Sequence, residues 1–146
     1  MSFSIEPAER VKKFIENYCT YSKREWSGQP FRLLPWQWDD LIKPLFGTLN
    51  VDGTRQYRTA YVEIPKKNGK SELCAALGLY MLTNDGEEGA EVYLAASDRE
   101  QASIVYQAAA AMVSNSGQLS KHLKRLDSRK RIIYHKKNSF MQVLSS

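Results

Sequence analysis

The first part of the chain carries apolar residues at helical spacing. A helix is predicted over residues 8–21, directly after Pro7, because apolar residues recur there three and four positions apart. A second helix is predicted over residues 35–46, where bulky apolar residues supply one surface. The apolar residues concerned are Val11, Phe14, Ile15 and Tyr18 in the first helix and Trp36, Trp38, Leu41, Ile42, Leu45 and Phe46 in the second. We expect the first helix to pack on the domain that follows.

The middle of the chain alternates between strand and helix patterns. β-Branched and aromatic residues predict a strand over 58–64, and a run of good helix formers without proline predicts a buried helix over 71–82. A short buried strand is expected over 90–96. The next helix is predicted to begin at Ser97, where Ser97 and Glu100 form a capping box.

Past about residue 113 the chain becomes basic and then returns to a strand pattern. Two short strands, 131–135 and 139–143, flank a turn and predict a hairpin. The alternation of strand and helix before them predicts an α/β domain with three layers around a parallel sheet. The expected layout is a helical lead-in over 1–56, a strand–loop–helix–strand–helix unit over 57–113, and a basic segment with the hairpin over 114–146.

Composition sets the outer limits of this picture. With 146 residues and 42% hydrophobic content, the chain has the size of one domain and can bury a core. Its longest apolar run, 73–82, is far shorter than the ~20 residues of a membrane span, and the charged amino terminus is unlike a signal peptide. We therefore expect a soluble, cytoplasmic protein without a membrane partner. Cys19 and Cys74 are spaced too widely for a metal knuckle and are expected to be buried or reduced thiols.

The segment between the first predicted strand and the buried helix carries the candidate chemistry. It reads Ile-Pro-Lys-Lys-Asn-Gly-Lys-Ser over 64–71, which is the P-loop pattern G-x-x-x-x-G-K-[ST] with Ile64 in place of the first glycine. In such a loop Gly69 lets the backbone approach the phosphates, Lys70 reaches the β- and γ-phosphate oxygens, and Ser71 places its hydroxyl on Mg²⁺. The pattern predicts a binding site for the phosphates of ATP or GTP.

The remaining loop residues extend this prediction. Pro65 supplies a rigid turn where the glycine is missing, and Asn68 belongs to the turn that surrounds the β-phosphate. Lys66 and Lys67 add positive charge, and Lys66 is a candidate, with Lys70, for a catalytic contact to the γ-phosphate as charge develops there. The alternatives are a solvated basic loop and an ordinary strand–turn–helix unit without a ligand.

Positive charge is concentrated near the carboxyl end. The formal net charge is +5, and residues 121–137 hold eight lysines and arginines against one acid, Asp127. Such a block attracts nucleic-acid phosphates through counterion release, without reading sequence. The candidate DNA contacts are Lys124, Arg125, Arg129, Lys130 and Arg131. The alternative is a solvated basic face, to which His122 and His135 would also belong because they have no metal-ligand spacing.

Three segments, taken in order, resemble one family. Phe-Arg-Leu-Leu-Pro-Trp-Gln at 31–37, the loop at 64–71, and Val-Tyr-Leu-Ala-Ala-Ser-Asp-Arg-Glu-Gln-Ala at 92–102 resemble the start of the large terminase subunit of tailed phages. That family packages double-stranded DNA with an amino-terminal ATPase domain and a carboxy-terminal, metal-dependent nuclease domain. The Walker A loop of that family often lacks the first glycine and has a basic residue early in the loop. Here Ile64 stands in place of that glycine, and Lys66 is the early basic residue.

The resemblance implies further ligands and partners. ATP and Mg²⁺ would be the cofactors, double-stranded DNA, the small terminase subunit and the portal the partners, and the bacterial host cytoplasm the location of a phage- or prophage-encoded protein. Gln37 occupies the position at which the family places a glutamine against the adenine. The alternative for Gln37 is an ordinary polar residue on the exposed side of its helix.

One feature of the family's ATPase is missing from the sequence. No apolar run ending in Asp-Glu follows Ser71, so the acids that hold the Mg²⁺ water shell and orient the attacking water are not found. We expect the family's catalytic carboxylates and nuclease to lie beyond Ser146, and the chain to bind a nucleotide weakly without hydrolysing it. In related ATPase sheets two later strands separate the first two, so unusual strand pairing or homo-oligomerisation is expected here.

Two alternatives remain open from the sequence. One is a fragment of a helicase-like P-loop NTPase, a class that also combines an upstream glutamine with a Gly-Lys-Ser loop. The other is a non-enzymatic, basic module for DNA binding or assembly, in which the loop only stabilises the fold.

Overall fold

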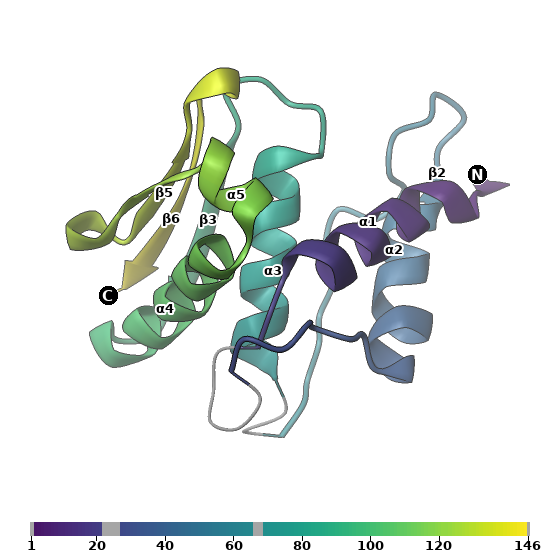
Figure 1. Ribbon diagram of the computed structural model, residues 1–146. Helices are drawn as coiled ribbons and strands as arrows, with labels where there is room; N and C mark the ends of the chain where they lie inside the picture. Colours follow the sequence, from purple (N-terminus) through teal and green to yellow (C-terminus); the bar gives the residue numbers. More distant parts are fainter. Residues whose placement is uncertain (1, 22–26, 66–68, 146) are drawn as a thin grey trace.

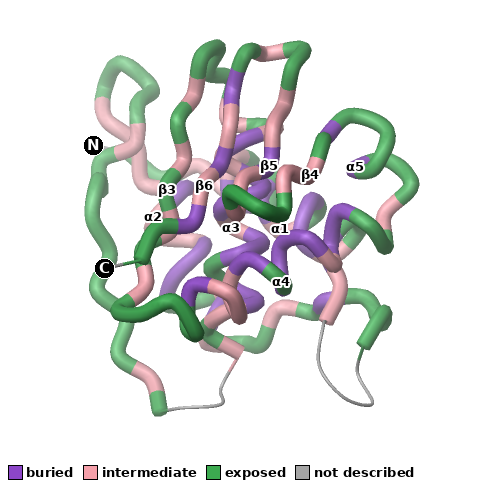
Figure 2. The backbone as a smooth tube through the Cα atoms, turned by 90° about the vertical axis from the view of Figure 1, so that its left-hand side faces the viewer, coloured by how far each residue is buried: buried purple, intermediate pink, exposed green. Residues whose placement is uncertain are grey.

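The computed structural model describes residues 2–21, 27–65 and 69–145. Figure 1 shows a sheet on one side of the molecule, two long helices against it, and the amino-terminal helices on the far side of these. The amino-terminal part consists of β1 (Ser2–Phe3), α1 (Ile5–Tyr18), a π-helix η2 (Gln37–Ile42), α2 (Lys43–Gly47) and β2 (Thr48–Leu49). Buried residues gather between the sheet and the helices, as Figure 2 shows.

The two predicted amino-terminal helices are confirmed, with changes in detail. Helix α1 begins at Ile5, before the predicted start, because Pro7 fits the first helical turn, where an N–H has no partner to lose. The second predicted helix contains the π-helix η2, in which the N–H of Lys43 bonds to the carbonyl of Trp38. Pro44 lacks an N–H, so the hydrogen-bond ladder is interrupted at this point.

Helix α3 (Lys70–Thr83) is the central element of the fold. It contacts α1 on one side and the sheet and α4 (Arg99–Asn115) on the other. Gly78 permits this close approach, since a Cβ there would lie 2.7 Å from the sulfur of Met141. Helix α4 was predicted to be capped by Ser97, but the cap is Asp98, whose carboxylate accepts from the N–H of Gln101 at 2.8 Å. Asp is as good an N-cap as Ser, and the sequence offers both.

The sheet has the strand order β3-β6-β5-β4. Strand β3 (Glu91–Ala96) runs parallel to β6 (Ser139–Ser145), which pairs antiparallel with β5 (Arg131–Tyr134), as β5 does with β4 (Lys124–Leu126). The predicted strand at 90–96 and the predicted hairpin are confirmed. Helix α5 (Gly117–His122) and β4 were not predicted.

Two short 3-10 turns connect the antiparallel strands. Turn η3 (Asp127–Arg129) ends at Lys130, and η4 (His135–Lys137) ends at Asn138. Both Lys130 and Asn138 have left-handed backbone, with φ of 50° and 52°. Asn adopts this conformation readily, whereas Lys does so seldom. The tight turns keep the three antiparallel strands in register.

Three sequence-based expectations about the sheet are wrong for the described residues. No strand forms over 58–64, where Tyr61 is 86% exposed and Val62 is 40% exposed. The sheet is mixed, because the hairpin adds two antiparallel strands to one parallel pair. Helices α3 and α4 cover one face of the sheet, and the amino-terminal helices lie beyond them, so the described sheet is not enclosed between two helical layers (Figure 1). Segment 58–64 stays outside the sheet because strand formation needs a neighbouring strand, and none of the described strands pairs with it.

The cysteines and the helices allow two further statements. Cys19 is buried, and this burial raises the pKa of its thiol to about 12. Cys74 is also a free thiol, but it lies on the exposed side of α3. Among the described residues, no helix combines the length and the apolar character that crossing a membrane requires.

Candidate nucleotide site and basic groove

The predicted phosphate loop ends at the first turn of helix α3. Gly69 is the N-cap of α3 and has φ +78°, in the left-handed region that favours glycine. A Cβ at this position would meet only a carboxylate oxygen of Glu72 at 3.9 Å, so the backbone conformation and not the space requires glycine. Lys70 and Ser71 are the first two residues of the helix, Lys70 exposed and Ser71 half-buried. The helix therefore carries an ammonium and a hydroxyl on its first two residues.

The backbone at this point suits an anion. Helix α3 is 14 residues long, and its first intrahelical bond runs from the N–H of Leu73 to the carbonyl of Gly69 at 3.0 Å. The N–H groups of the first turn and the positive end of the helix dipole face the loop. Glu72, in the same turn, is buried. Phosphate oxygens fit such a helix terminus, and the residues present therefore fit the phosphates of a nucleotide.

The rest of the predicted loop is described only at its start. Pro65 is exposed and Ile64 half-buried. Lys66, Lys67 and Asn68 lie outside the described residues, so their predicted contacts to phosphate, and the catalytic role of Lys66, stay predictions. Among the described residues no group of three or more His, Cys, Asp or Glu side chains is placed to hold a metal ion. The hydroxyl of Ser71 thus stays the predicted Mg²⁺ ligand on its own.

Gln37 is buried rather than exposed, which makes the ordinary-surface interpretation of this residue wrong. Its side chain is 2% exposed, and its Oε1 accepts from the N–H of Leu34 at 2.8 Å. This hydrogen bond caps the helix that begins at residue 35. The preceding segment is held by a carboxylate oxygen of Glu16, which accepts from the N–H of Leu33 at 3.1 Å. In Figure 1 the starts of η2 and α3 lie toward the same, lower end of the molecule.

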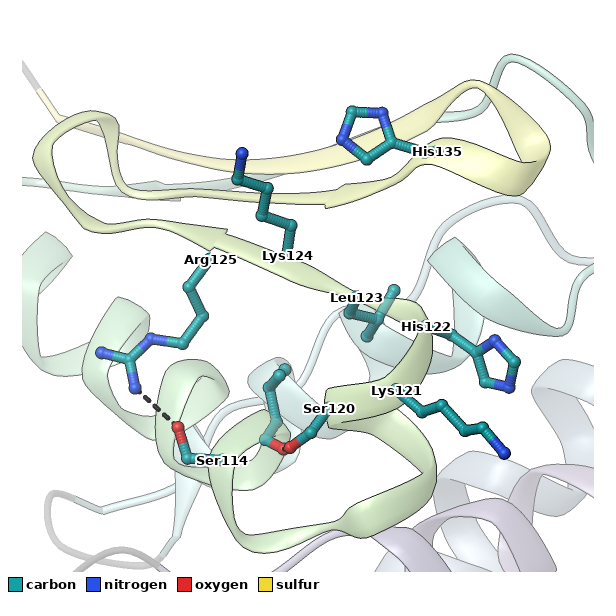
Figure 3. A pocket seen from close by; sticks show the side chains of 9 residues that line it. Ser114, Ser120, Lys121, His122, Leu123, Lys124, Arg125 and His135 are labelled. Atoms are coloured by element: carbon teal, nitrogen blue, oxygen red, sulfur yellow. Dashed lines mark hydrogen bonds between the residues drawn. The ribbon is translucent and has the colours of Figure 1, made fainter.

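A second feature lies at the other end of the molecule. An open groove of about 650 Å³ runs between the end of α4, α5, β4 and η4. It is lined by Val113, Ser114, Ser120, Lys121, His122, Leu123, Lys124, Arg125 and His135. Figure 3 shows Lys124 and His135 on one side, Arg125 reaching down to Ser114, and Lys121 and His122 at the end of α5. The basic groups line the groove without meeting at one point.

Some of the predicted DNA contacts are occupied within the protein. Arg125 donates to both carboxylate oxygens of Asp127, at 3.0 and 2.9 Å, and to the hydroxyl of Ser114 at 2.6 Å. The hydrogen bonds to Arg125 and Tyr106 lower the pKa of the Asp127 carboxyl. Arg131 donates to Oε1 of Gln142, with its guanidinium 4.1 Å from the centre of the Phe140 ring. By contrast Lys124 and Arg129 are exposed, and Lys130 is half-buried in its turn.

Residues 35–146 match the family model described as the ATPase domain of the terminase large subunit. The chain is 31% identical to the terminase large subunit of Enterobacteria phage HK97 over 126 residues, which is 86% of this chain and 24% of the relative. The crystal structure of the HK97 bacteriophage large terminase matches with a TM-score of 0.79, at 31% identity, over 94% of this chain and 27% of that one. The chain belongs to the phage terminase large subunit family.

The sequence-based recognition of this family is confirmed, and so is the α/β class of the fold. The terminase chain spans about a quarter of the length of the relatives it matches. Of the site residues predicted from the sequence, the structure brings Gly69, Lys70 and Ser71 together at one turn. Sequence reasoning named Lys121, His122 and His135 as part of a basic surface but not as one groove, because only the fold brings α5 beside η4.

Proposed function

We propose that this terminase chain supplies the ATP- and Mg²⁺-binding part of a phage DNA-packaging motor. The observation that carries the proposal is the left-handed Gly69 at the start of α3, followed directly by Lys70 and Ser71, in a chain whose residues 35–146 match a terminase ATPase domain. A helix start of this kind binds phosphate, and the next two side chains are those that a P-loop needs. In this proposal the replacement of the first P-loop glycine by Ile64 is a feature of the family and does not prevent phosphate binding.

Each residue has a specific role in the proposed site. Lys70 binds the β- and γ-phosphate oxygens, and the hydroxyl of Ser71 binds Mg²⁺. Gly69 keeps the backbone open to the phosphates. The loop residues Pro65, Lys66, Lys67 and Asn68 complete the turn around the phosphates, and Lys66 contacts the γ-phosphate. ATP supplies the phosphoanhydride bond whose hydrolysis drives translocation in the complete protein.

Gln37 holds the adenine in this proposal. The hydrogen bond from the N–H of Leu34 to its Oε1 supports the assignment, because it fixes the orientation of the remaining amide group. A substitution Gln37→Ala would also remove the cap on the Leu34 N–H. The adenine role is therefore best tested by comparing ATP with GTP: wild type should prefer ATP, and Gln37→Glu, which keeps the Oε1 acceptor but removes the amide donor, should lose that preference.

The proposed partners follow from the family. Double-stranded DNA would contact the basic segment 121–137, and the small terminase subunit and the portal would belong to the complete packaging complex in the host cytoplasm. Exposed Lys124 supports DNA contact, since its ammonium group is open to solvent. A helicase-like P-loop NTPase fragment and a non-enzymatic, basic module for DNA binding or assembly are the competing functions.

ATP binding tests the central part of the proposal. ATP with Mg²⁺ should raise the melting temperature of wild type, because a ligand that binds only the folded state stabilises that state. Lys70→Ala should show little or no rise. Lys13→Ala, which removes an exposed lysine from α1, is the matched control and should behave as wild type. If ATP stabilises wild type no more than Lys70→Ala, the phosphate site does not exist in this chain.

A further inference from the structure

Some residues of the basic segment 121–137 line one groove, although they are not all neighbours in the sequence. The carboxy-terminal turn of α5, the start of β4 and turn η4 lie around one hollow of about 650 Å³. Lys121 and His122 come from α5, Lys124 and Arg125 from β4 or its start, and His135 from η4 (Figure 3). Arg129 and Lys136 are exposed members of the same basic segment but do not line it.

The charge of the groove is uncompensated at two lysines. Asp127, the one acid between residues 121 and 137, is bound by Arg125 and accepts from the hydroxyl of Tyr106 at 2.6 Å. Its carboxylate therefore neutralises Arg125 and not the lysines. Lys121 and Lys124 are exposed, and among the described residues no acidic side chain lines the groove. The potential in the groove is thus positive.

The arrangement fits an extended polyanion better than a single phosphate. The side chains in Figure 3 point along different directions around the groove and do not converge. A single bound phosphate requires donors aimed at one point, whereas a nucleic-acid backbone offers successive phosphates to separated cations. Ser114 and Ser120 add hydroxyl groups to the floor, and both already take part in hydrogen bonds within the protein.

We propose that this groove, with Lys121 and Lys124 as its principal cations, is the surface on which the chain binds the phosphate backbone of duplex DNA. The proposal rests on the proposed function and narrows it, because it moves the contact away from the 129–131 turn to the space between α5 and η4. Arg131 is excluded as a main contact by its commitment to Gln142 and Phe140. Binding is independent of base sequence, since the groove presents charge and no base-reading side chain set.

The test compares two double variants with the same net charge. Lys121→Ala with Lys124→Ala removes the groove lysines, and Arg129→Ala with Lys136→Ala removes two exposed cations of the same segment outside it. Each pair lowers the formal net charge from +5 to +3, so general electrostatic attraction is reduced equally. Binding of a short DNA duplex is measured by fluorescence anisotropy over a series of salt concentrations, and circular dichroism checks that both variants fold.

The groove pair should weaken binding by about tenfold or more at low salt and reduce the salt slope by about two, because two phosphate contacts are lost. The control pair should change the slope by much less. Equal effects of the two pairs would show diffuse attraction and overturn the groove. A larger effect of the control pair would return the contact to the turns. An absence of DNA binding by wild type would overturn DNA contact itself, while the ATP-dependent rise in melting temperature tests the nucleotide site separately.

A chemical footprint checks the groove without variants. Acetylation of lysines by a small reagent is followed by mass spectrometry with and without the duplex. Lys121 and Lys124 should be protected by DNA, while Lys136 and Lys13 should react as in the free protein. Protection of Lys136 without protection of the groove lysines would contradict the proposal even if the variants bind DNA poorly for another reason.

Discussion

Residues 57–65 and the hairpin of β5 and β6 have similar strand-forming compositions and different structures. Both are rich in β-branched and aromatic residues, and both were predicted to contain strands. The hairpin forms a ladder, and Ile132, Met141 and Val143 are buried in the core. In segment 57–65 no strand forms, and Tyr61 is 86% exposed. The intrinsic preference of a segment therefore decides little until a partner strand is available.

The difference lies in the distance to the partner along the chain. A hairpin brings its own second strand within a few residues, and turn η4 with left-handed Asn138 sets the register. Strand β3 finds β6 through a longer connection, but α3 and α4 cover the pair and stabilise it. Segment 57–65 is joined to α3 by the predicted phosphate loop, and none of the described strands pairs with it. The site thus lies between a well-packed helix and an unpaired segment.

Hydrogen exchange should give the largest contrast between the two regions. Amides of residues 59–63 should exchange with little protection, because they belong to no ladder and their side chains are largely exposed. Amides in the middle of β6, which pairs on both sides, should exchange at least about a thousandfold more slowly. Exchange followed by mass spectrometry of peptides measures both. Strong protection at 59–63 would mean that the segment pairs in solution, and the comparison would lose its basis.

A core substitution in the hairpin should have the next largest effect. Met141→Ala removes a side chain that is 1% exposed and lies against Gly78 of α3, so the free energy of unfolding should fall by about 3 kcal/mol. Leu144→Ala on the same strand is the control: this residue is 42% exposed and should cost less than about 1 kcal/mol. Urea unfolding measures both. A loss as small as that of Leu144→Ala would indicate that α3 is not packed on the sheet.

The junction between the unpaired segment and α3 should be sensitive to backbone conformation. Gly69→Ala forces a Cβ into φ +78°, which should cost about 1 to 2 kcal/mol. Gly69→Asn should cost less, because Asn tolerates the left-handed region, and Gly117→Ala is a control at a glycine without positive φ. Thermal unfolding without nucleotide separates this cost from any loss of ATP binding. If Gly69→Ala and Gly117→Ala have equal effects, the left-handed turn is not required by the fold.

The sequence predicted these regions unequally, for physical reasons. The elements at 90–96 and 131–143 could be predicted because burial and pairing agree with their local patterns. Segment 58–64 could not, since its outcome depends on strands that it does not meet. The Asp98 cap was missed because Ser97 and Asp98 are equally good candidates and only the backbone angle of Asp98 decides.

The site was predicted in a similar, partial way. Gly69, Lys70 and Ser71 are neighbours in sequence, so their proximity at the start of α3 follows from the motif alone. The burial of Gln37 could not be predicted, because its partner is the backbone N–H of Leu34, just before the helix, and not a side chain that a pattern would reveal. The groove could not be predicted either, since it requires α5 and β4, which the pattern did not indicate.

The smallest expected effect is a loss of stability at low pH, when the hydrogen bonds between the sheet and α4 through Asp127 are weakened. Asp127 receives hydrogen bonds from Arg125 and from Tyr106 of α4, and these lower the pKa of its carboxyl. A lowered pKa in the folded state means that the stabilisation is complete above the unfolded pKa of about 4 and is lost as the pH falls through the folded value. Wild type should therefore lose stability below about pH 4 more steeply than Asp127→Asn, which has no carboxylate to protonate.

Arg125→Gln should flatten the same acid limb, because Arg125 is the main cause of the lowered pKa. The effect is small because Arg125 and Asp127 are partly exposed, with 34% and 58% of their side chains accessible. Melting temperatures between pH 3 and pH 7, in steps that resolve the acid limb, measure the difference. If Asp127→Asn retains the wild-type slope, the contacts of Asp127 with Tyr106 and Arg125 do not stabilise the packing of β4, β5 and β6 on α4. The stability of these strands then comes from their buried face alone.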